Sequence, residues 1–165
     1  MIKKIKELDI YFQDIDYSEV KTIEGSKSLR EFIAKMLSYY PWWILLLYQI
    51  REILVIAFGL VKHEKPDKLP SIAPEDVSFR PGDNVSFFMV SKAEEDLYWV
   101  AETPEDKHLI AYFGIVPEKL ENGLTKFHVF TSVKYKHWTG SIYFNLIRPF
   151  HHLVVYTMMK AGISK

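Results

Sequence analysis

Histidines are the side chains best suited to acid–base or metal chemistry in this sequence, which contains six of them. Two, His151 and His152, are adjacent near the C-terminus. Neighbouring residues on a helix point about 100° apart, whereas two metal ligands on one helix are usually four residues apart. We therefore expect no metal site. We interpret His151, which follows Pro149 and Phe150, as a donor to backbone groups near the proline rather than as a catalytic base.

The absence of cysteine excludes disulfides, thiolate nucleophiles and Cys-ligated zinc or iron–sulfur sites. The sequence also lacks a paired-carboxylate motif, a Gly-rich phosphate loop, a GxSxG elbow and an HExxH helix. Hydrolase and nucleotide chemistry therefore have no support in the sequence, and we expect no cofactor. Whether the protein is an enzyme stays open.

A set of aromatic and polar side chains favours a small-molecule pocket, which is mostly apolar with a few polar groups. The expected ligand-binding residues are Trp99, Tyr112, His128, Phe130, Trp138, Tyr143, Asn145 and Arg148. The alternative is that the aromatic members of this set only pack in the core. A third histidine, His108, also falls on an expected strand, where it contacts a ligand, faces solvent or bonds to a neighbour.

The charges balance, with 21 Lys and Arg against 21 Asp and Glu, so no overall field attracts nucleic acid or an anionic membrane. We expect no nucleic-acid partner. The distribution is uneven, because residues 122–165 contain six Lys and Arg but no Asp or Glu. We expect complementary charges between neighbouring elements, with an anion-favouring face as the alternative.

The main positioning element is the closing stretch, His137 to Lys160, which reads as a long apolar-rich helix kinked at Pro149. One stripe at three- or four-residue spacing comprises Ile142, Leu146, Phe150, Leu153, Thr157 and Ala161. Another comprises Asn145, Arg148, His152 and Tyr156. A helix this apolar needs a partner surface, and the strand-like segments before it predict a sheet.

The first strand is expected at Leu8 to Tyr17, where apolar and polar residues alternate imperfectly. Ser28 and Glu31 have the spacing of a capping box, so a helix should begin there. Apolar residues at helical spacing continue that helix until Pro41 ends the run.

The stretch Trp42 to Leu60 is almost continuously apolar, but Gln49, Arg51 and Glu52 lie at its middle. A charge at the bilayer centre costs about 2.5–3.5 kcal/mol on insertion scales, so we expect an amphipathic helix ended by Gly59 rather than a membrane span. Its broad apolar circumference predicts a homodimer surface or peripheral membrane contact in addition to core packing.

A proline-rich loop, Lys62 to Asp83, is expected to precede an antiparallel meander. Its strands are Val85 to Ser91, Leu97 to Glu102, His108 to Val116 and Leu124 to Lys136. Alternation in the last strand predicts one covered sheet face and one wet face. The whole chain, residues 1–165, is expected to form one α+β domain. Its start, MIKKIKELDIYF, lacks a secretory signal, so we expect a cytoplasmic protein.

Several motifs resemble an uncharacterised bacterial family of the START-like (SRPBCC, helix-grip) superfamily of polyketide cyclases, lipid-transfer domains and Bet v 1-like proteins. They are PWW at 41–43 with RE at 51–52, PGDNV at 81–85, DKHL at 106–109 and HWTGSIYFNLIRPFHHLVVYTMM at 137–159. The resemblance covers nearly the whole chain. It implies a curved antiparallel sheet gripping the C-terminal helix, with a hydrophobic cavity between them. The sequence departs from the pattern at 110–112, where Ile, Ala and Tyr replace an expected polar pair.

Three hypotheses follow. The first is binding of a small apolar or lipid-like molecule in that cavity, with Trp138, Tyr143 and Asn145 near the pocket and Arg148 offering charge to an acidic head group. The second is an enzyme of the polyketide cyclase or dehydratase type, in which His128 performs acid–base work. The third is a non-catalytic domain that dimerises through Trp42 to Leu60.

Overall fold

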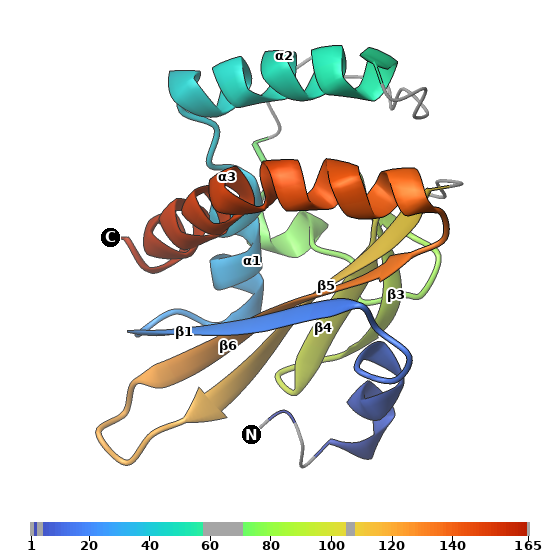
Figure 1. Ribbon diagram of the computed structural model, residues 1–165. Helices are drawn as coiled ribbons and strands as arrows, with labels where there is room; N and C mark the ends of the chain where they lie inside the picture. Colours follow the sequence, from blue (N-terminus) through green and yellow to red (C-terminus); the bar gives the residue numbers. More distant parts are fainter. Residues whose placement is uncertain (1, 3–4, 58–70, 105–107, 165) are drawn as a thin grey trace.

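The computed structural model describes residues 2, 5–57, 71–104 and 108–164, arranged as one sheet with helices on both faces (Figure 1). The antiparallel sheet has six strands in the order β1-β6-β5-β4-β3-β2. The strands are β1 Tyr17–Gly25, β2 Asn84–Val85, β3 Phe88–Glu94, β4 Tyr98–Glu102, β5 Leu109–Lys119 and β6 Thr125–Tyr135. The helices are the 3₁₀ helix η2 Lys6–Tyr11, α1 Leu29–Leu37, α2 Trp42–Ala57, the 3₁₀ helix η3 Pro74–Asp76 and α3 Trp138–Ile163.

This arrangement confirms the predicted α+β class, with an antiparallel sheet, two helices after the first strand and a long closing helix that packs on the sheet. The strands expected at 97–102, 108–116 and 124–136 correspond to β4, β5 and β6. The strand expected at 85–91 is instead a tight hairpin of β2 and β3. Ser86, with φ of 58°, forms the turn between them.

The prediction of a first strand at Leu8 to Tyr17 was wrong. Residues 6–11 form η2, in which Leu8 and Tyr11 are buried while Ile10 is exposed. This three-residue spacing suits a helical turn, which buries one side without needing a strand neighbour. The first strand, β1, begins only at Tyr17.

The η2 segment also corrects the expectation of a wet second sheet face. Its buried side chains form a small core with residues from the sheet face opposite the α-helices, namely Tyr98, Val100, Val116 and Phe130. Aromatic contacts join the layers, since the Phe12 and Phe130 ring centroids lie 4.9 Å apart. Both faces of the sheet are therefore covered at its centre.

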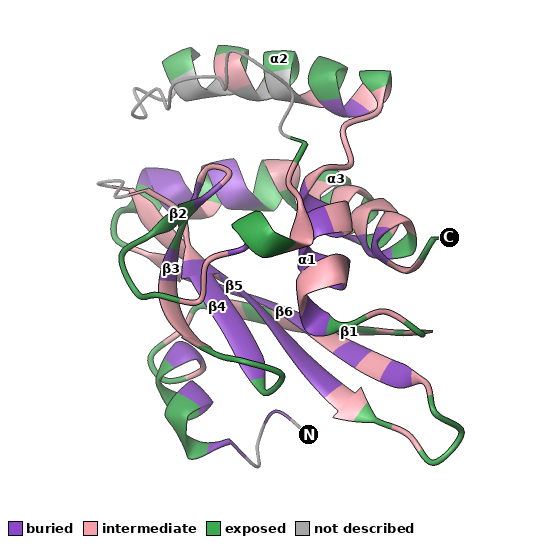
Figure 2. Ribbon diagram, turned by 180° about the vertical axis from the view of Figure 1, so that it is seen from behind, coloured by how far each residue is buried: buried purple, intermediate pink, exposed green. Residues whose placement is uncertain are grey.

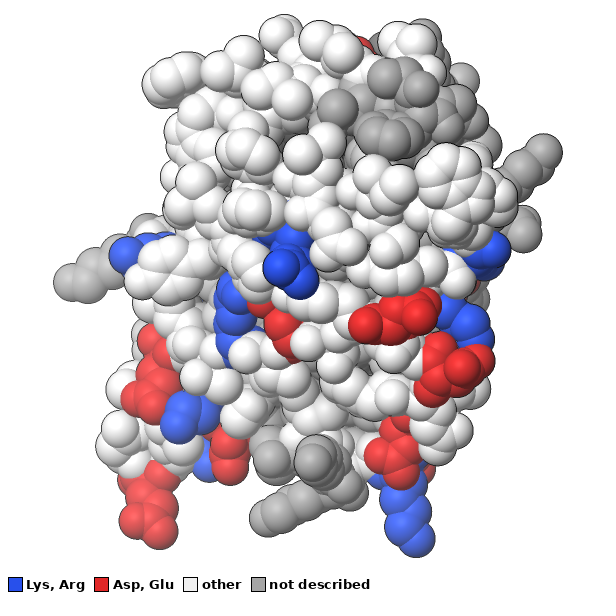
Figure 3. Space-filling view, viewed as in Figure 1, with Lys and Arg blue, Asp and Glu red and all other residues white. Residues whose placement is uncertain are grey.

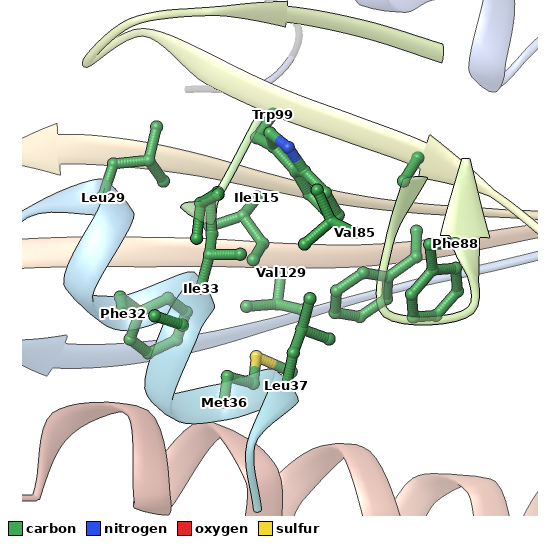
Figure 4. Close-up of a cluster of buried hydrophobic side chains, with 14 of the residues drawn as sticks. Leu29, Phe32, Ile33, Met36, Leu37, Val85, Phe88, Trp99, Ile115 and Val129 are labelled. Carbon is green, nitrogen blue, oxygen red and sulfur yellow. The ribbon is translucent and has the colours of Figure 1, made fainter. Parts of the chain in front are cut away.

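The short helix α1 fills the other face of the sheet. Ser28 and Glu31 form the predicted capping box. Phe32 is fully buried and stacks on Phe127 of β6, with ring centroids 4.0 Å apart. Figure 4 shows the apolar residues of α1 pointing into the same cluster as Trp99 and Ile115 of the sheet. The space between sheet and closing helix is thus packed with side chains of α1.

The closing helix α3 runs across α1 and the edge of the sheet formed by β1 and β6. Pro149 lies inside α3, and Figure 1 shows the helix changing direction about halfway along. Proline removes one backbone hydrogen bond and crowds the preceding turn, which explains a bend at this point.

The apolar helix α2 lies on the far side of α3 from the sheet in both views (Figures 1 and 2). Within the described part of the chain, no helix is both long and apolar enough to cross a bilayer. The predicted stop at Gly59 and the first part of the expected loop, 62–70, lie outside the described residues.

Candidate functional site

The surface of α3 that points away from the sheet is apolar and about half exposed. Its buried residues, among them Tyr143, Phe144 and Val155, face α1 and the sheet. On the opposite side, residues at three- or four-residue spacing are 47–67% exposed: Trp138, Ile142, Leu146, Phe150, Leu153 and Tyr156. We call these six residues the outer stripe. Helical periodicity gives α3 two apolar sides, and only one of them is in the core.

The helix α2 presents a second uncovered apolar surface. Ile44 is buried, but the exposed apolar side chains of α2 include Trp42, Leu45, Leu46, Ile50, Ile53 and Ile56. Figure 2 accordingly shows many exposed positions along this helix. The helix contacts α3 much less than α1 does, so it leaves the outer stripe open.

Together these residues of α2 and the outer stripe form what we call the outer apolar surface. On the face shown in Figure 3, few charged atoms are visible in the upper part, over α2, whereas Lys, Arg, Asp and Glu gather lower down, over the sheet. Contiguous apolar patches of this kind are rare on soluble monomers and mark binding surfaces. The fold therefore provides a candidate site for an apolar partner or ligand.

A polar cluster lies beside this surface, where one flank of α3 meets β1. The strand register places Tyr17, Glu19 and Lys21 opposite Val133, Thr131 and Val129 of β6, on the face that carries the α-helices. Two residues of α3 complete the cluster, His151 and His152. We call these five residues the β1–α3 cluster.

Direct contacts hold the β1–α3 cluster together. The Nδ1 atom of His152 lies 2.7 Å from Glu19 Oε2 and 2.9 Å from Lys21 Nζ. Its Nε2 atom lies 3.3 Å from the Tyr17 hydroxyl. Lys21 also pairs with Glu19. The His151 Nδ1 atom lies 3.4 Å from Glu19 Oε1, within ion-pair distance.

The environment strongly favours the charged form of Glu19, whose side chain is only 12% exposed. Burial by itself raises the pKa of this carboxyl, but the interactions with His151, Lys21 and His152 outweigh it and lower the pKa to about 2. Glu19 is therefore ionised at neutral pH, where it ties α3 to the edge strand.

Arg148 lies on the same flank of α3. Its guanidinium carbon lies 5.7 Å from the centre of the Tyr17 ring, a cation–π distance. Among the residues that the structure describes, Arg148 has no carboxylate within ion-pair distance. The side chain is exposed.

The ligand-binding residues expected on the sheet lie on two different faces. Trp99 is fully buried on the α1 side, and its indole N–H donates to the Ser78 carbonyl at 3.0 Å. Tyr112 and Phe130 lie on the opposite face, against η2. His128 is on that face too, where its Nε2 lies 2.6 Å from Glu118 Oε2.

The four expected residues on α3 point in different directions. Trp138 is part of the outer stripe and 67% exposed, whereas Tyr143 is buried toward the core. Asn145 is exposed and donates to the Ser141 carbonyl at 2.9 Å. Arg148 lies near the β1–α3 cluster. The structure thus brings Trp138, Asn145 and Arg148 to the accessible part of α3 and separates them from the sheet residues.

Sequence reasoning missed the β1 members of the cluster, Tyr17, Glu19 and Lys21. The sequence YSEVKTIEG offers little signal, because polar residues occur at both alternate sets of positions; the alternation of exposed and half-buried residues along β1 is seen only in the structure. Nothing in the sequence indicates that one face of β1 meets the histidines of α3. Sequence reasoning placed Ile142, Leu146, Phe150 and Leu153 on one apolar stripe of α3, but it did not show that this side of the helix is exposed.

The start of α3 has a structural explanation. His137 caps the helix, and Thr139 Oγ1 lies 2.9 Å from its Nδ1 and 2.5 Å from the Nδ1 of His108. A Cβ atom at Gly140 would clash with the His108 carbonyl oxygen. This close approach explains why the chain has glycine at position 140. The contacts of Thr139 and Gly140 with His108, the residue before β5, anchor the start of α3 to the sheet. In the described residues, no group of His, Asp and Glu side chains could hold a metal ion.

Comparisons with known proteins identify a family without naming an activity. A family model described as "Protein of unknown function (DUF2867)" matches residues 9–158. No curated protein matches the chain. Among solved structures, it is similar to a hypothetical protein from Helicobacter pylori, with 10% identity and a TM-score of 0.43, over 92% of this chain and 88% of the other.

Proposed function

The chain belongs to the DUF2867 family, and from its structure we propose that it binds a small apolar or lipid-like molecule. The proposed binding site is the outer apolar surface, formed by the exposed apolar side chains of α2 and the outer stripe of α3. The proposal keeps the kind of ligand that the sequence predicts. It moves the site from the space between sheet and α3, which α1 fills, to the far side of α3.

The observation that carries the proposal is the exposure of two apolar helical surfaces that lie near each other without covering one another. Leu146 and Phe150 of α3 are each 48% exposed, and Leu46 of α2 is 50% exposed. Burying one methylene group contributes about 0.8 kcal/mol, so an alkyl chain with about ten methylenes in contact would gain about 8 kcal/mol before the entropy of association is subtracted. Subtracting an association cost of at least about 4 kcal/mol leaves about 4 kcal/mol, which corresponds to a dissociation constant in the millimolar range.

The same proposal includes membership of the START-like superfamily. An antiparallel sheet with a long C-terminal helix packed on it is compatible with the helix-grip arrangement. The lipid-transfer domains of that superfamily bind apolar ligands, which is in keeping with the proposed ligand class.

Native mass spectrometry of the purified full-length protein tests the proposal, which predicts a co-purified apolar ligand or, after delipidation, saturable binding of a fluorescent fatty acid. Replacing two outer-stripe residues, Leu146→Asp with Phe150→Asp, should weaken that binding at least tenfold. Val20→Asp is the matched control, because Val20 is 49% exposed but lies on the other face of the sheet. Equal binding by both variants, or no binding by the native protein, would contradict the proposal.

A second candidate is dimerisation through Trp42 to Leu60, favoured by the exposed Trp42, Ile53 and Ile56. Sedimentation velocity distinguishes the two. If the native protein is a dimer that Ile53→Asp dissociates, and if it binds no fatty acid, the dimerisation hypothesis is favoured. If the native protein is a monomer that binds fatty acid, the ligand-binding hypothesis is favoured. Peripheral membrane contact would use the same apolar helix.

The cyclase or dehydratase alternative has less support. His128, its proposed acid–base residue, is paired with Glu118 and lies across the sheet from the outer apolar surface. An acid–base group must lie within hydrogen-bond reach of its substrate.

A further inference from the structure

We propose that Tyr17 is a nucleophile for acyl transfer from activated esters and that His152 is the base that accepts its proton. In this proposal Glu19 positions His152, and Arg148 supplies a positive charge near the reacting oxygen. The inference concerns the β1–α3 cluster and does not rest on the proposed binding of an apolar ligand. It is drawn from the direction of the hydrogen bonds within that cluster.

The contacts of His152 determine which ring nitrogen carries its proton. The Nδ1 atom lies 2.7 Å from Glu19 Oε2, and the ionised carboxylate only accepts hydrogen bonds. Neutral His152 therefore carries its proton on Nδ1 and donates it to Glu19. Lys21 Nζ lies 2.9 Å from the same nitrogen, but lysine is a donor and is paired with Glu19. His151 Nδ1 lies near the other carboxylate oxygen, at 3.4 Å.

The second ring nitrogen of His152 faces a hydroxyl group. With Nδ1 protonated, Nε2 has a lone pair, and it lies 3.3 Å from the Tyr17 hydroxyl oxygen. The hydroxyl therefore donates to Nε2, and Glu19, His152 and Tyr17 form a carboxylate–imidazole–hydroxyl chain. Activated nucleophiles have this order, in which a base contacts the hydroxyl and a third group orients the base.

Tyr17 is held in place and needs a base to react. Its ring packs on Phe144 of α3, with ring centroids 5.0 Å apart. Burial and the neighbouring Glu19 raise the pKa of Tyr17 above its ordinary value, and the smaller opposing effect of Arg148 does not cancel them. A neutral phenol is a poor nucleophile, so transfer of its proton to His152 is what activates it.

Arg148 adds a positive charge beside the phenol. Its guanidinium carbon lies 5.7 Å from the centre of the Tyr17 ring. The Arg148 side chain is exposed, the His152 side chain is 41% exposed and Tyr17 is only partly buried, so a small ester has access to this flank of α3. A fixed cation near an attacked carbonyl stabilises the negative charge that develops on its oxygen.

The proposed step balances without a cofactor. The Tyr17 oxygen attacks the carbonyl carbon of the ester, and its proton passes to Nε2 of His152. The tetrahedral oxyanion then collapses, the bond to the leaving phenolate breaks, and an acyl ester of Tyr17 remains. The proton on His152 passes to the leaving group or to water. Hydrolysis of the acyl ester, with His152 again as the base, regenerates Tyr17.

Tyr135 of β6 provides a control within the same molecule. It is partly buried like Tyr17, and burial and Asp16 raise its pKa while Arg148 opposes them. Among the residues that the structure describes, no histidine lies within hydrogen-bond distance of the Tyr135 hydroxyl. The two tyrosines therefore share a similar environment and differ in their contact with His152.

The experiment treats the full-length protein with 4-nitrophenyl acetate and follows acetylation of each residue by peptide mass spectrometry. Tyr17 should be acetylated at least about a hundredfold faster than Tyr135, because general base catalysis contributes about 10²–10⁴-fold. The His152→Gln variant should lose most of this difference while the rate at Tyr135 stays the same. The rate at Tyr17 should rise with pH and level off once the imidazole is neutral, whereas the rate at Tyr135 should keep rising with the phenolate fraction.

Two further variants test the supporting residues. Glu19→Gln should slow acetylation of Tyr17 and remove the levelling of its pH profile, and Glu19→Asp, which keeps the carboxylate, should restore part of the rate. Arg148→Gln should slow acetylation of Tyr17 at least tenfold, whereas Lys160→Gln, at the far end of α3, should not change it. Circular dichroism confirms that each variant is folded under the conditions of the assay.

Three results would overturn the proposal. The first is acetylation of Tyr17 that is no faster than acetylation of Tyr135. The second is acetylation of His152 or Lys21 in place of Tyr17, because one of these side chains would then be the nucleophile. The third is an unchanged rate at Tyr17 in His152→Gln. None of them affects the proposed apolar ligand, whose binding is measured with the outer-stripe variants.

Discussion

Removing the charge of Glu19 tests the β1–α3 cluster most directly. The substitution Glu19→Gln keeps the size of the side chain but removes the anion that contacts Lys21, His151 and His152. We expect this variant to fold and to be clearly less stable than the native protein at neutral pH, because three basic side chains lose their common anionic partner.

The size of the expected loss of stability follows from the pKa of Glu19. Burial opposes ionisation, but the basic neighbours lower the pKa of Glu19 from its ordinary value of 4.5 to about 2. Since a tenfold change in a proton-binding constant corresponds to about 1.4 kcal/mol, the folded state favours the carboxylate by about 3 kcal/mol. At pH 7, Glu19→Gln should lower the free energy of unfolding by about this amount.

The direction of the pKa shift determines how this stabilisation changes with pH. A carboxyl whose pKa is lower in the folded than in the unfolded chain stabilises the fold above the unfolded pKa. This contribution is lost as the pH falls from about 4.5 to about 2. The difference in stability between the native protein and Glu19→Gln should therefore be full at pH 7 and shrink across that range.

Urea denaturation followed by circular dichroism, at several pH values from 7 to 2, measures this difference. Glu24→Gln is the matched control, because Glu24 lies on the same strand but its partner Lys126 and its own side chain are 34% and 43% exposed. Such surface pairs contribute at most about 1 kcal/mol. A difference below 1 kcal/mol at pH 7, or one that does not change with pH, would refute the reasoning.

Three further substitutions test the packing that positions the site. Phe32→Ala should lower the free energy of unfolding by about 3–5 kcal/mol, because the side chain is fully buried between α1 and the sheet. Gly140→Ala should cost about 2 kcal/mol or more, since the added Cβ meets the backbone oxygen of His108 and neither can move freely. Ser28→Ala should cost about 1 kcal/mol through loss of the capping box.

The same urea titrations measure all three effects. Ser141→Ala, one residue after Gly140 in the first turns of α3, should change stability little. A stable Gly140→Ala protein would mean that α3 does not approach β5 as closely as the structure has it. A change of less than 1 kcal/mol for Phe32→Ala would contradict the role of α1 as the filling of the space beneath α3.

The sequence predicted the parts of the fold whose signals are local. Ser28 and Glu31 marked the start of α1, because a capping box is a contact between residues three apart. The alternation in residues 124–136 revealed β6, and the long apolar run ending near Lys160 revealed α3. Residues 8–17 failed as a strand because Leu8 and Tyr11 are buried by a sheet face that comes much later in the chain.

The candidate site was predictable only in its components. The apolar spacing of Ile142, Leu146, Phe150 and Leu153, the charge of Arg148 and the lack of acidic residues after position 121 can all be read from the sequence. Which side of α3 meets the core, and that α1 rather than a ligand fills the space beneath it, depend on packing between distant segments.

The closing helix α3 separates what the sequence alone determines from what the tertiary structure decides. Its sequence determined that it would be long, apolar on one stripe, polar on another and bent at Pro149, because these properties arise from residues within a few positions of one another. Only the tertiary structure decided that the polar flank meets Glu19 of β1 while the apolar stripe faces outward. That choice depends on the competition of all the packed surfaces, in which Phe144, Val155 and Met159 bury the other side of the helix.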